Sequence, residues 1–148
     1  MTERFVTHDT FIIDRTLEVP NEQVFKAWST PELKAQWFAK ADQFNFQVGG
    51  KETNHGGPPP EGPVFHFEAT YQEIVPNERI IYSYTMDQGE NRISVSTVTV
   101  EFNATETGTH LIYTEQGTYV DGHDKPEIRE HGTGIMLDKL VKLMKGEG

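Results

Sequence analysis

Between residues 64 and 120 the sequence alternates apolar and polar residues in consecutive runs, and this pattern constrains the fold more than any other feature. The runs are 64–74, 79–86, 92–102 and 109–120. In the second run, for example, Ile80, Tyr82 and Tyr84 fall on one face. A period of two is typical of strands that bury one face, and short turns join neighbouring strands in antiparallel order. The segment therefore predicts an antiparallel meander.

The flanking segments predict one more strand and three helices. Residues 10–19 are rich in β-branched and apolar residues and end at Pro20, which indicates an opening strand. Asn21 then suits the N-cap of a short helix, and Thr30-Pro31 suits the start of a second one. Residues 44–48 alternate like a further strand. Apolar residues at helical spacing predict a C-terminal amphipathic helix over 124–145.

Residues 49–63 stand apart because they contain five glycines and four prolines. Glycine and proline at this density disfavour regular structure. A connection of this length exceeds the usual four to six residues, which is typical of functional loops. The composition predicts an irregular, mobile loop that acts as a gate.

The order of these elements predicts the fold class. A strand, two short helices, a run of antiparallel strands and one long helix indicate an α+β protein with a helix-grip fold. In this arrangement a curved antiparallel sheet wraps around the long C-terminal helix. A strongly bent sheet around one helix is not filled by side chains alone, so we expect an internal cavity.

Composition narrows the class of function. The length of 148 residues predicts a single domain over 1–148, and sixteen aromatic residues (9 Phe, 5 Tyr and 2 Trp) argue against disorder. The net charge of −10 disfavours binding to nucleic acid or to an anionic membrane. Cysteine is absent, and no segment reads as a signal peptide or a membrane span. We expect a cytoplasmic protein.

Three stretches carry a resemblance to a known family: VPNEQVFKAWSTPELKAQWF (19–38), ERIIYSY (78–84) and GTHLIYTEQG (108–117). They resemble the START-like superfamily, also called SRPBCC or Bet v allergen-type. Within it the chain is similar to the branch of activator of heat shock protein ATPase-like proteins, which is related to polyketide cyclases. The resemblance covers about residues 10–145. It implies the helix-grip fold, which serves lipid carriers, hormone receptors, cyclases and co-chaperones alike.

Glu115 is the strongest candidate for a polar group in the cavity. If Leu111 and Tyr113 face the interior, the strand period places Glu115 there too. A buried carboxylate must be paired, hydrogen-bonded or protonated. It would therefore contact a ligand or move protons, and the alternative is a structural pair with Arg129 or with a tyrosine hydroxyl.

Several other residues are candidates for the cavity wall. Tyrosines on apolar walls suit a flat, hydroxylated aromatic ligand. His131 lies at the edge of the apolar stripe of the C-terminal helix, which is centred near Met136, and either leans toward Glu115 or caps the core. The adjacent Trp37 and Phe38 point in different directions, so one of them is expected at the entrance. The remaining candidates are Met136 itself, Tyr82, Tyr84 and Tyr113.

No metal site or cofactor is expected. His66 and Glu68 form an H-x-E pair, but the zinc sites that use this pair also need cysteine ligands. The leading hypothesis is a binding protein, a monomer or weak dimer, for a small hydrophobic ligand that is lipid-like or polycyclic aromatic. The alternatives are a polyketide cyclase or hydratase that uses a cavity Glu or His, and a co-chaperone-like ATPase activator with a chaperone partner.

Overall fold

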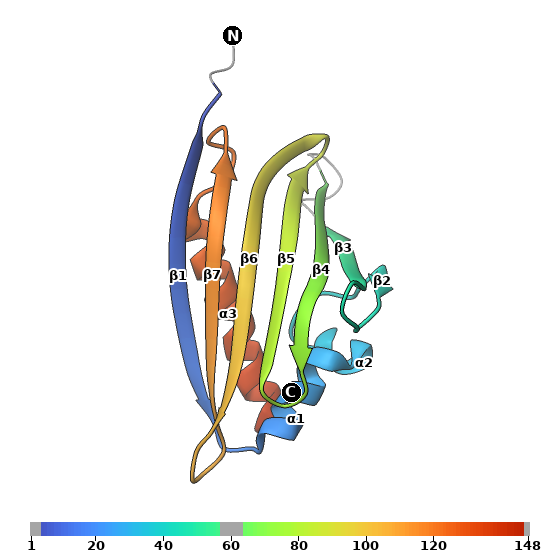
Figure 1. Ribbon diagram of the computed structural model, residues 1–148, viewed down its shortest axis with the longest axis vertical. Coiled ribbons are helices and arrows are strands. Elements are labelled where there is room, and N and C mark those ends of the chain that lie inside the picture. Colours follow the sequence, from blue (N-terminus) through green and yellow to red (C-terminus); the bar gives the residue numbers. More distant parts are fainter. Residues whose placement is uncertain (1–3, 57–63, 147–148) are drawn as a thin grey trace.

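A single curved sheet with a long helix on its concave side forms the architecture (Figure 1). The computed structural model describes residues 4–56 and 64–146. The strands are β1 (Val6–Leu17), β2 (Gln43–Phe44), β3 (Lys51–Gly56), β4 (Phe65–Val75), β5 (Arg79–Gln88), β6 (Asn91–Ala104) and β7 (Thr109–Val120). The helices are α1 (Asn21–Ser29), α2 (Pro31–Lys34) and α3 (Pro126–Met144). This is the predicted helix-grip fold.

The sheet has the strand order β1-β7-β6-β5-β4-β3-β2, and every pair of neighbours is antiparallel. The strands from β4 to β7 form the antiparallel meander that the alternation in the sequence predicts. Its inward residues form the core together with the apolar residues of α1 and α3. They include Phe67, Tyr71, Ile80, Tyr82, Val98, Val100 and Leu111. None of the helices in the described ranges is long and apolar enough to cross a bilayer.

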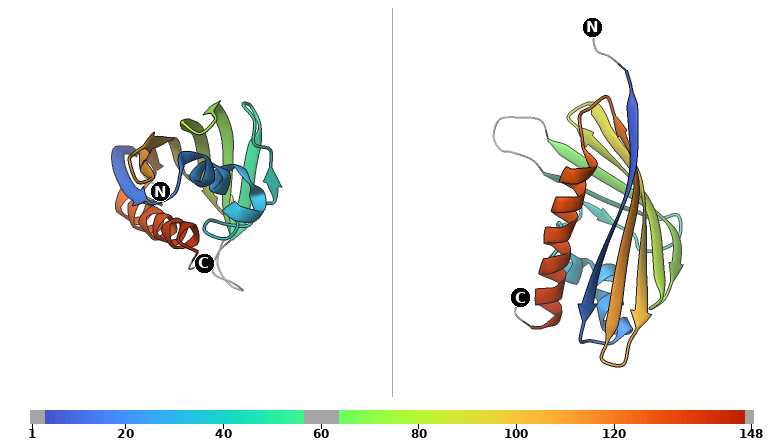
Figure 2. Two further views of the ribbon diagram at one scale, coloured as in Figure 1. Left: turned by 90° about the horizontal axis from the view of Figure 1, so that it is seen from below. Right: turned by 90° about the vertical axis from the view of Figure 1, so that its left-hand side faces the viewer.

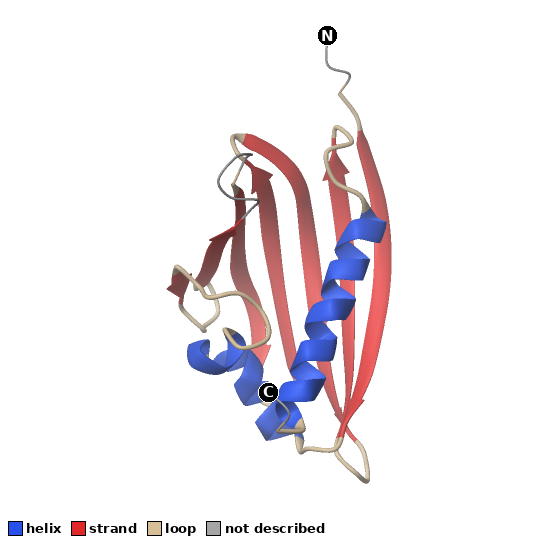
Figure 3. Ribbon diagram, turned by 180° about the vertical axis from the view of Figure 1, so that it is seen from behind, coloured by secondary structure: helices blue, strands red, loops and turns tan. Residues whose placement is uncertain are grey.

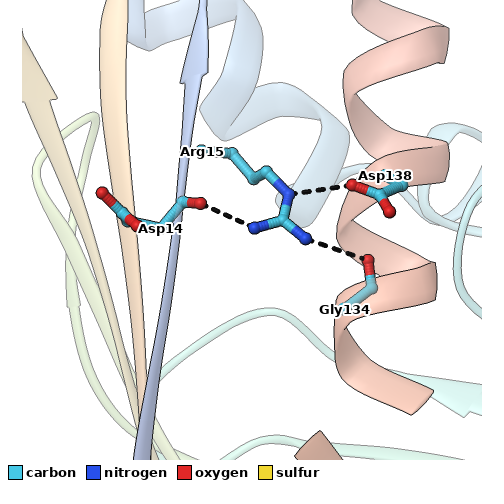
Figure 4. Close-up of polar contacts among 4 residues, drawn as sticks. All are labelled: Asp14, Arg15, Gly134 and Asp138. Atoms are coloured by element: carbon cyan, nitrogen blue, oxygen red, sulfur yellow. Dashed lines mark hydrogen bonds and ion pairs between the residues drawn. The ribbon is translucent and has the colours of Figure 1, made fainter. Parts of the chain in front are cut away.

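Helix α3 crosses the concave face of the sheet, as Figure 2 and Figure 3 show. Arg15 of β1 holds it in place: Nε donates to Asp138 Oδ1 at 2.9 Å, and Nη2 donates to the Gly134 carbonyl at 3.4 Å (Figure 4). The same guanidinium donates to the carbonyl of Asp14 at 2.7 Å. One side of α3 thus faces β1, and the other side faces the space enclosed by the curved sheet.

The expectation of one irregular loop over residues 49–63 was wrong in its first half. Lys51–Gly56 forms β3 and pairs with β4, while residues 57–63 lie outside the described part of the chain. The glycines here permit a close approach rather than disorder. A Cβ on Gly50 would lie 2.2 Å from the carbonyl oxygen of Asn45, so only glycine fits. Gly49 also adopts φ +85°, and its N–H donates to Tyr71 O at 2.8 Å.

Smaller corrections concern the ends of elements. The predicted strand over 44–48 shrinks to the two residues of β2. Pro20, not Asn21, occupies the N-cap of α1, and the Asn21 side chain instead donates to the carbonyl of Phe102 at 3.0 Å. In α3, Ile128 and Ile135 are exposed. The apolar face of α3 is therefore narrower than the sequence pattern indicates.

Candidate functional site

A cavity of about 300 Å³ lies between α3, the α1–α2 pair and the inner face of the sheet. Seven of its sixteen wall residues are aromatic, namely Trp28, Trp37, Phe38, Phe67, Tyr82, Tyr84 and Tyr113. Helix α3 contributes Arg129, Gly132, Thr133, Met136 and Leu137. These five positions follow helical spacing, so one stripe of α3 closes the cavity. Strand alternation and helix periodicity together build the enclosure.

The cavity brings together six of the eight residues that the sequence singled out. Tyr82 and Tyr84 project from β5 and Tyr113 from β7, Trp37 and Phe38 follow α2, and Met136 lies on α3. Trp37 is buried and donates from Nε1 to the Ala27 carbonyl at 3.0 Å, whereas Phe38 is partly exposed. This fits the expectation that only one of these two neighbours is fully enclosed.

Glu115 is completely buried but is not part of the cavity wall. Its carboxylate accepts a hydrogen bond from the Tyr84 hydroxyl at 2.7 Å and one from the Tyr113 hydroxyl at 2.8 Å. The two tyrosines therefore lie between the carboxylate and the cavity, and Glu115 fixes the direction of both hydroxyls. Burial raises the pKa of Glu115, and the two tyrosine hydrogen bonds oppose this increase.

This raised pKa predicts a specific dependence of stability on pH. Between the ordinary carboxyl pKa of 4.5 and the higher native pKa, the folded protein binds more protons at Glu115 than the unfolded chain does. Stability therefore decreases as the pH rises through that interval. Because Glu115→Gln removes this titration and keeps an acceptor, its unfolding free energy should vary less with pH than that of the wild type. Urea unfolding between about pH 4 and about pH 8 measures the difference.

Two parallel curves of unfolding free energy against pH would contradict this assignment. A matched control is Glu68→Gln, since Glu68 is exposed and pairs with Lys51 at the surface. That substitution should leave the pH dependence in the same interval nearly unchanged, because an exposed pair contributes little.

His131 lies outside the cavity. It is exposed and lines a surface groove between β1 and α3, together with Ile12, Glu130 and Ile135. The helical stripe that contains His131 faces β1 rather than the cavity. His131 therefore does not lean toward Glu115. Arg129, the other partner considered for Glu115, instead forms an ion pair with Asp124, with Nε and Oδ2 separated by 3.3 Å.

Sequence reasoning missed a buried ion pair beside the cavity. Lys34 of α2 lines the cavity, and its Nζ donates to Glu52 Oε1 at 2.6 Å. The Tyr71 hydroxyl donates to the same oxygen at 2.5 Å. Both charged residues are nearly inaccessible, with side-chain exposures of 4% and 1%. A lysine in a short helix is normally solvent-exposed, so no pattern marked Lys34.

Aromatic rings surround the amine of Lys34. Its Nζ lies 5.0 Å from the ring centre of Phe38, and the corresponding distances to Trp28 and Tyr82 are 5.5 and 5.8 Å. These three rings also line the cavity. Burial lowers the pKa of the Lys34 amine, and the neighbouring Glu52 carboxylate opposes this change. The site is thus a dry, ring-lined amine next to a proton acceptor.

Two further polar groups in the cavity wall have no hydrogen-bond partner among the described residues. They are the indole Nε1 of Trp28, a residue that is 2% exposed, and Nδ2 of Asn54. Buried donors are normally paired, and an unpaired one costs about 1–3 kcal/mol. An acceptor group on a bound molecule would satisfy such donors.

Comparison with known proteins places the chain among bacterial relatives. A family profile described as activator of Hsp90 ATPase homolog 1-like protein matches residues 18–145. An uncharacterized protein from Rhizobium leguminosarum has 41% identity and a TM-score of 0.91, with 99% of this chain and 100% of that chain covered. The Mll3558 protein from Rhizobium loti has 38% identity and a TM-score of 0.87, with 93% and 97% covered. No curated protein matches the sequence.

A more distant solved structure has the same fold. The CV1439 protein from Chromobacterium violaceum has 25% identity and a TM-score of 0.81, with 94% of this chain and 97% of that chain covered. In all three cases the match spans nearly the whole of both chains, so the cavity lies within the shared fold.

Proposed function

We propose, since the chain belongs to the activator of Hsp90 ATPase homolog 1-like family, that its cavity binds a small aromatic molecule with few polar groups. Membership in this START-type family confirms the resemblance inferred from the sequence and supports a ligand-binding fold. The observation that carries the proposal is a partly open cavity of about 300 Å³ that is lined by aromatic rings and by buried donors without a partner among the described residues. Ligand pockets are concave, mostly apolar and hold a few placed polar groups.

The size and chemistry of the cavity narrow the ligand class. A volume of about 300 Å³ is at the lower end of the range for small-molecule sites, which favours one or two rings over a sterol. Rings such as Trp28 and Phe67 favour a flat ligand, which stacks or packs edge to face. An acceptor on the ligand would meet the Trp28 and Asn54 donors. We therefore favour a hydroxylated or carbonyl-bearing aromatic compound.

We prefer this proposal to a co-chaperone role because the cavity is observed in this chain itself. ATPase activation is said only of the family. The cyclase or hydratase alternative based on Glu115 and His131 loses its support, since neither side chain lines the cavity. An enzymatic role would have to rest on other residues of the wall.

Tryptophan emission offers a direct test, because both tryptophans of the chain line the cavity. Naphthol should quench this emission with a saturable, single-site dependence on its concentration. Free N-acetyltryptophanamide, titrated in the same way, corrects for collisional quenching and absorption by naphthol. Quenching of the protein that stays linear and equals that of the free compound would overturn the proposal.

A further inference from the structure

We propose that Lys34 acts as a nucleophile that forms an imine with an aldehyde or ketone bound in the cavity. This inference rests on the proposed ligand binding and adds to it a covalent step and a class of ligand. It rests on the enclosure of the Lys34 amine, on its proton acceptor and on its contrast with every other lysine of the chain.

The first support is the position of the amine. Nζ of Lys34 lies among Trp28, Phe38 and Tyr82, and all four residues border the same cavity. A carbonyl compound that fills the cavity therefore meets the amine. The surrounding rings exclude water, which favours the neutral, nucleophilic form of a lysine and disfavours hydrolysis of an imine.

The second support is the proton acceptor. Glu52 Oε1 lies 2.6 Å from Nζ and also accepts the Tyr71 hydroxyl at 2.5 Å. The other carboxylate oxygen, Oε2, is buried and has no partner among the described residues. Glu52 Oε1 is thus placed to accept one proton from the ion-paired Lys34 amine when a ligand fills the site, because two neutral groups in contact cost less in a dry site than two charges do. The lowered pKa of the Lys34 amine agrees with this transfer.

These groups are sufficient for a balanced reaction. The nitrogen lone pair of neutral Lys34 attacks the carbonyl carbon, and the carbonyl oxygen takes up the proton held by Glu52. A carbinolamine results. Loss of its hydroxyl as water, with a proton supplied through Glu52 from the nitrogen, gives the imine. One carbon–nitrogen double bond replaces one carbon–oxygen double bond, and no oxidant or reductant is required.

The third support is that Lys34 differs from every other lysine. The chain has eight lysines, all within the described residues, and the other seven are exposed. Exposed amines are strongly hydrated, and none of these seven lines the cavity. A carbonyl compound at neutral pH should therefore distinguish Lys34 from the rest, which provides seven internal controls in one protein.

The experiment uses the unmodified chain, naphthaldehyde as the probe and cyanoborohydride to convert any imine into a stable secondary amine. Peptide mapping by mass spectrometry then gives the extent of labelling at each lysine. At neutral pH we expect labelling of Lys34 to exceed the mean of the seven exposed lysines by roughly tenfold or more. Naphthalenemethanol, which lacks the carbonyl, should compete and reduce labelling of Lys34 alone.

Two other outcomes are distinguishable. If naphthalenemethanol quenches tryptophan emission saturably but Lys34 is labelled no more than the exposed lysines, the imine inference is wrong and ligand binding stands. If neither compound gives saturable quenching and Lys34 is unlabelled, the proposed function fails and the inference fails with it. Because the comparison is made within the wild-type chain, it does not depend on a folded Lys34 variant.

Discussion

Replacing Lys34 by methionine is expected to lower the free energy of unfolding by about 3–5 kcal/mol, the usual cost of breaking a buried ion pair. Methionine fills a similar volume, but it leaves the Glu52 carboxylate buried without its cation. The Tyr71 hydroxyl remains as a donor to that carboxylate and does not neutralise it. Urea unfolding at neutral pH measures the change.

Two control variants make this result specific. Glu52→Leu added to Lys34→Met removes both charges, and the double variant should recover most of the lost stability. Lys51→Met breaks the Lys51–Glu68 pair, whose side chains are about half exposed, and should cost less than about 1 kcal/mol. If Lys34→Met costs no more than Lys51→Met, Lys34 is hydrated and the dry amine described above does not exist.

Gly132→Leu is expected to weaken ligand binding by roughly tenfold to a hundredfold while it stabilises the fold. Gly132 lies on the stripe of α3 that closes the cavity, and a Cβ there would meet no atom within 4 Å. A leucine would occupy space that the ligand needs. The ligand-bound protein would then be overpacked, which costs the complex about 1–3 kcal/mol. Leucine is also a better helix former than glycine by about 0.5–1 kcal/mol. Naphthol titration and thermal unfolding measure the two effects.

The matched control is Gly134→Ala, on the face of α3 that is directed toward β1. A Cβ at Gly134 would make an ordinary contact of 3.7 Å with Arg15 Nη2. This variant should gain similar stability and bind naphthol as the wild type does. Equal affinities of Gly132→Leu and the wild type would show that naphthol binds elsewhere on the protein.

The sequence predicts the sheet well because strand alternation and turn residues are local signals. The meander from β4 to β7, the two short helices and α3 all follow from such patterns. The prediction fails at β3, because the glycine and proline density predicts a loop there. At Gly50 the glycine is needed because the backbone of Asn45 approaches closely, and this requirement arises from a contact that local composition does not reveal.

The candidate site is harder to predict because periodicity assigns a face but not a depth. Alternation correctly places Glu115 on the inner face of β7, yet Tyr84 and Tyr113 lie between its carboxylate and the cavity. Helical spacing places His131 at the edge of the apolar stripe of α3, which is compatible with either a buried or an exposed side chain. His131 is exposed because this side of α3 lies along β1, outside the cavity.

The ion pair between Lys34 and Glu52 could not be found from local patterns at all. The two residues are 18 positions apart, and each belongs to a segment in which charged residues are ordinarily exposed. They are buried together only because the fold brings the Lys34 amine of α2 next to the Glu52 carboxylate of β3. Asp124, just before α3, and Arg129, in the first turns of α3, form a second ion pair that the sequence analysis did not predict.

Methyl NMR of the complex tests the central claim, that the cavity holds the ligand, most directly. The chain has four methionines; Met86 and Met136 line the cavity, whereas Met144 packs against the core elsewhere. With methyl-labelled methionine, saturating naphthol should shift the signals of Met86 and Met136 and give contacts between their methyl groups and the naphthol protons. The Met144 signal should stay in place. Unchanged Met86 and Met136 signals in the presence of saturating naphthol would contradict the account.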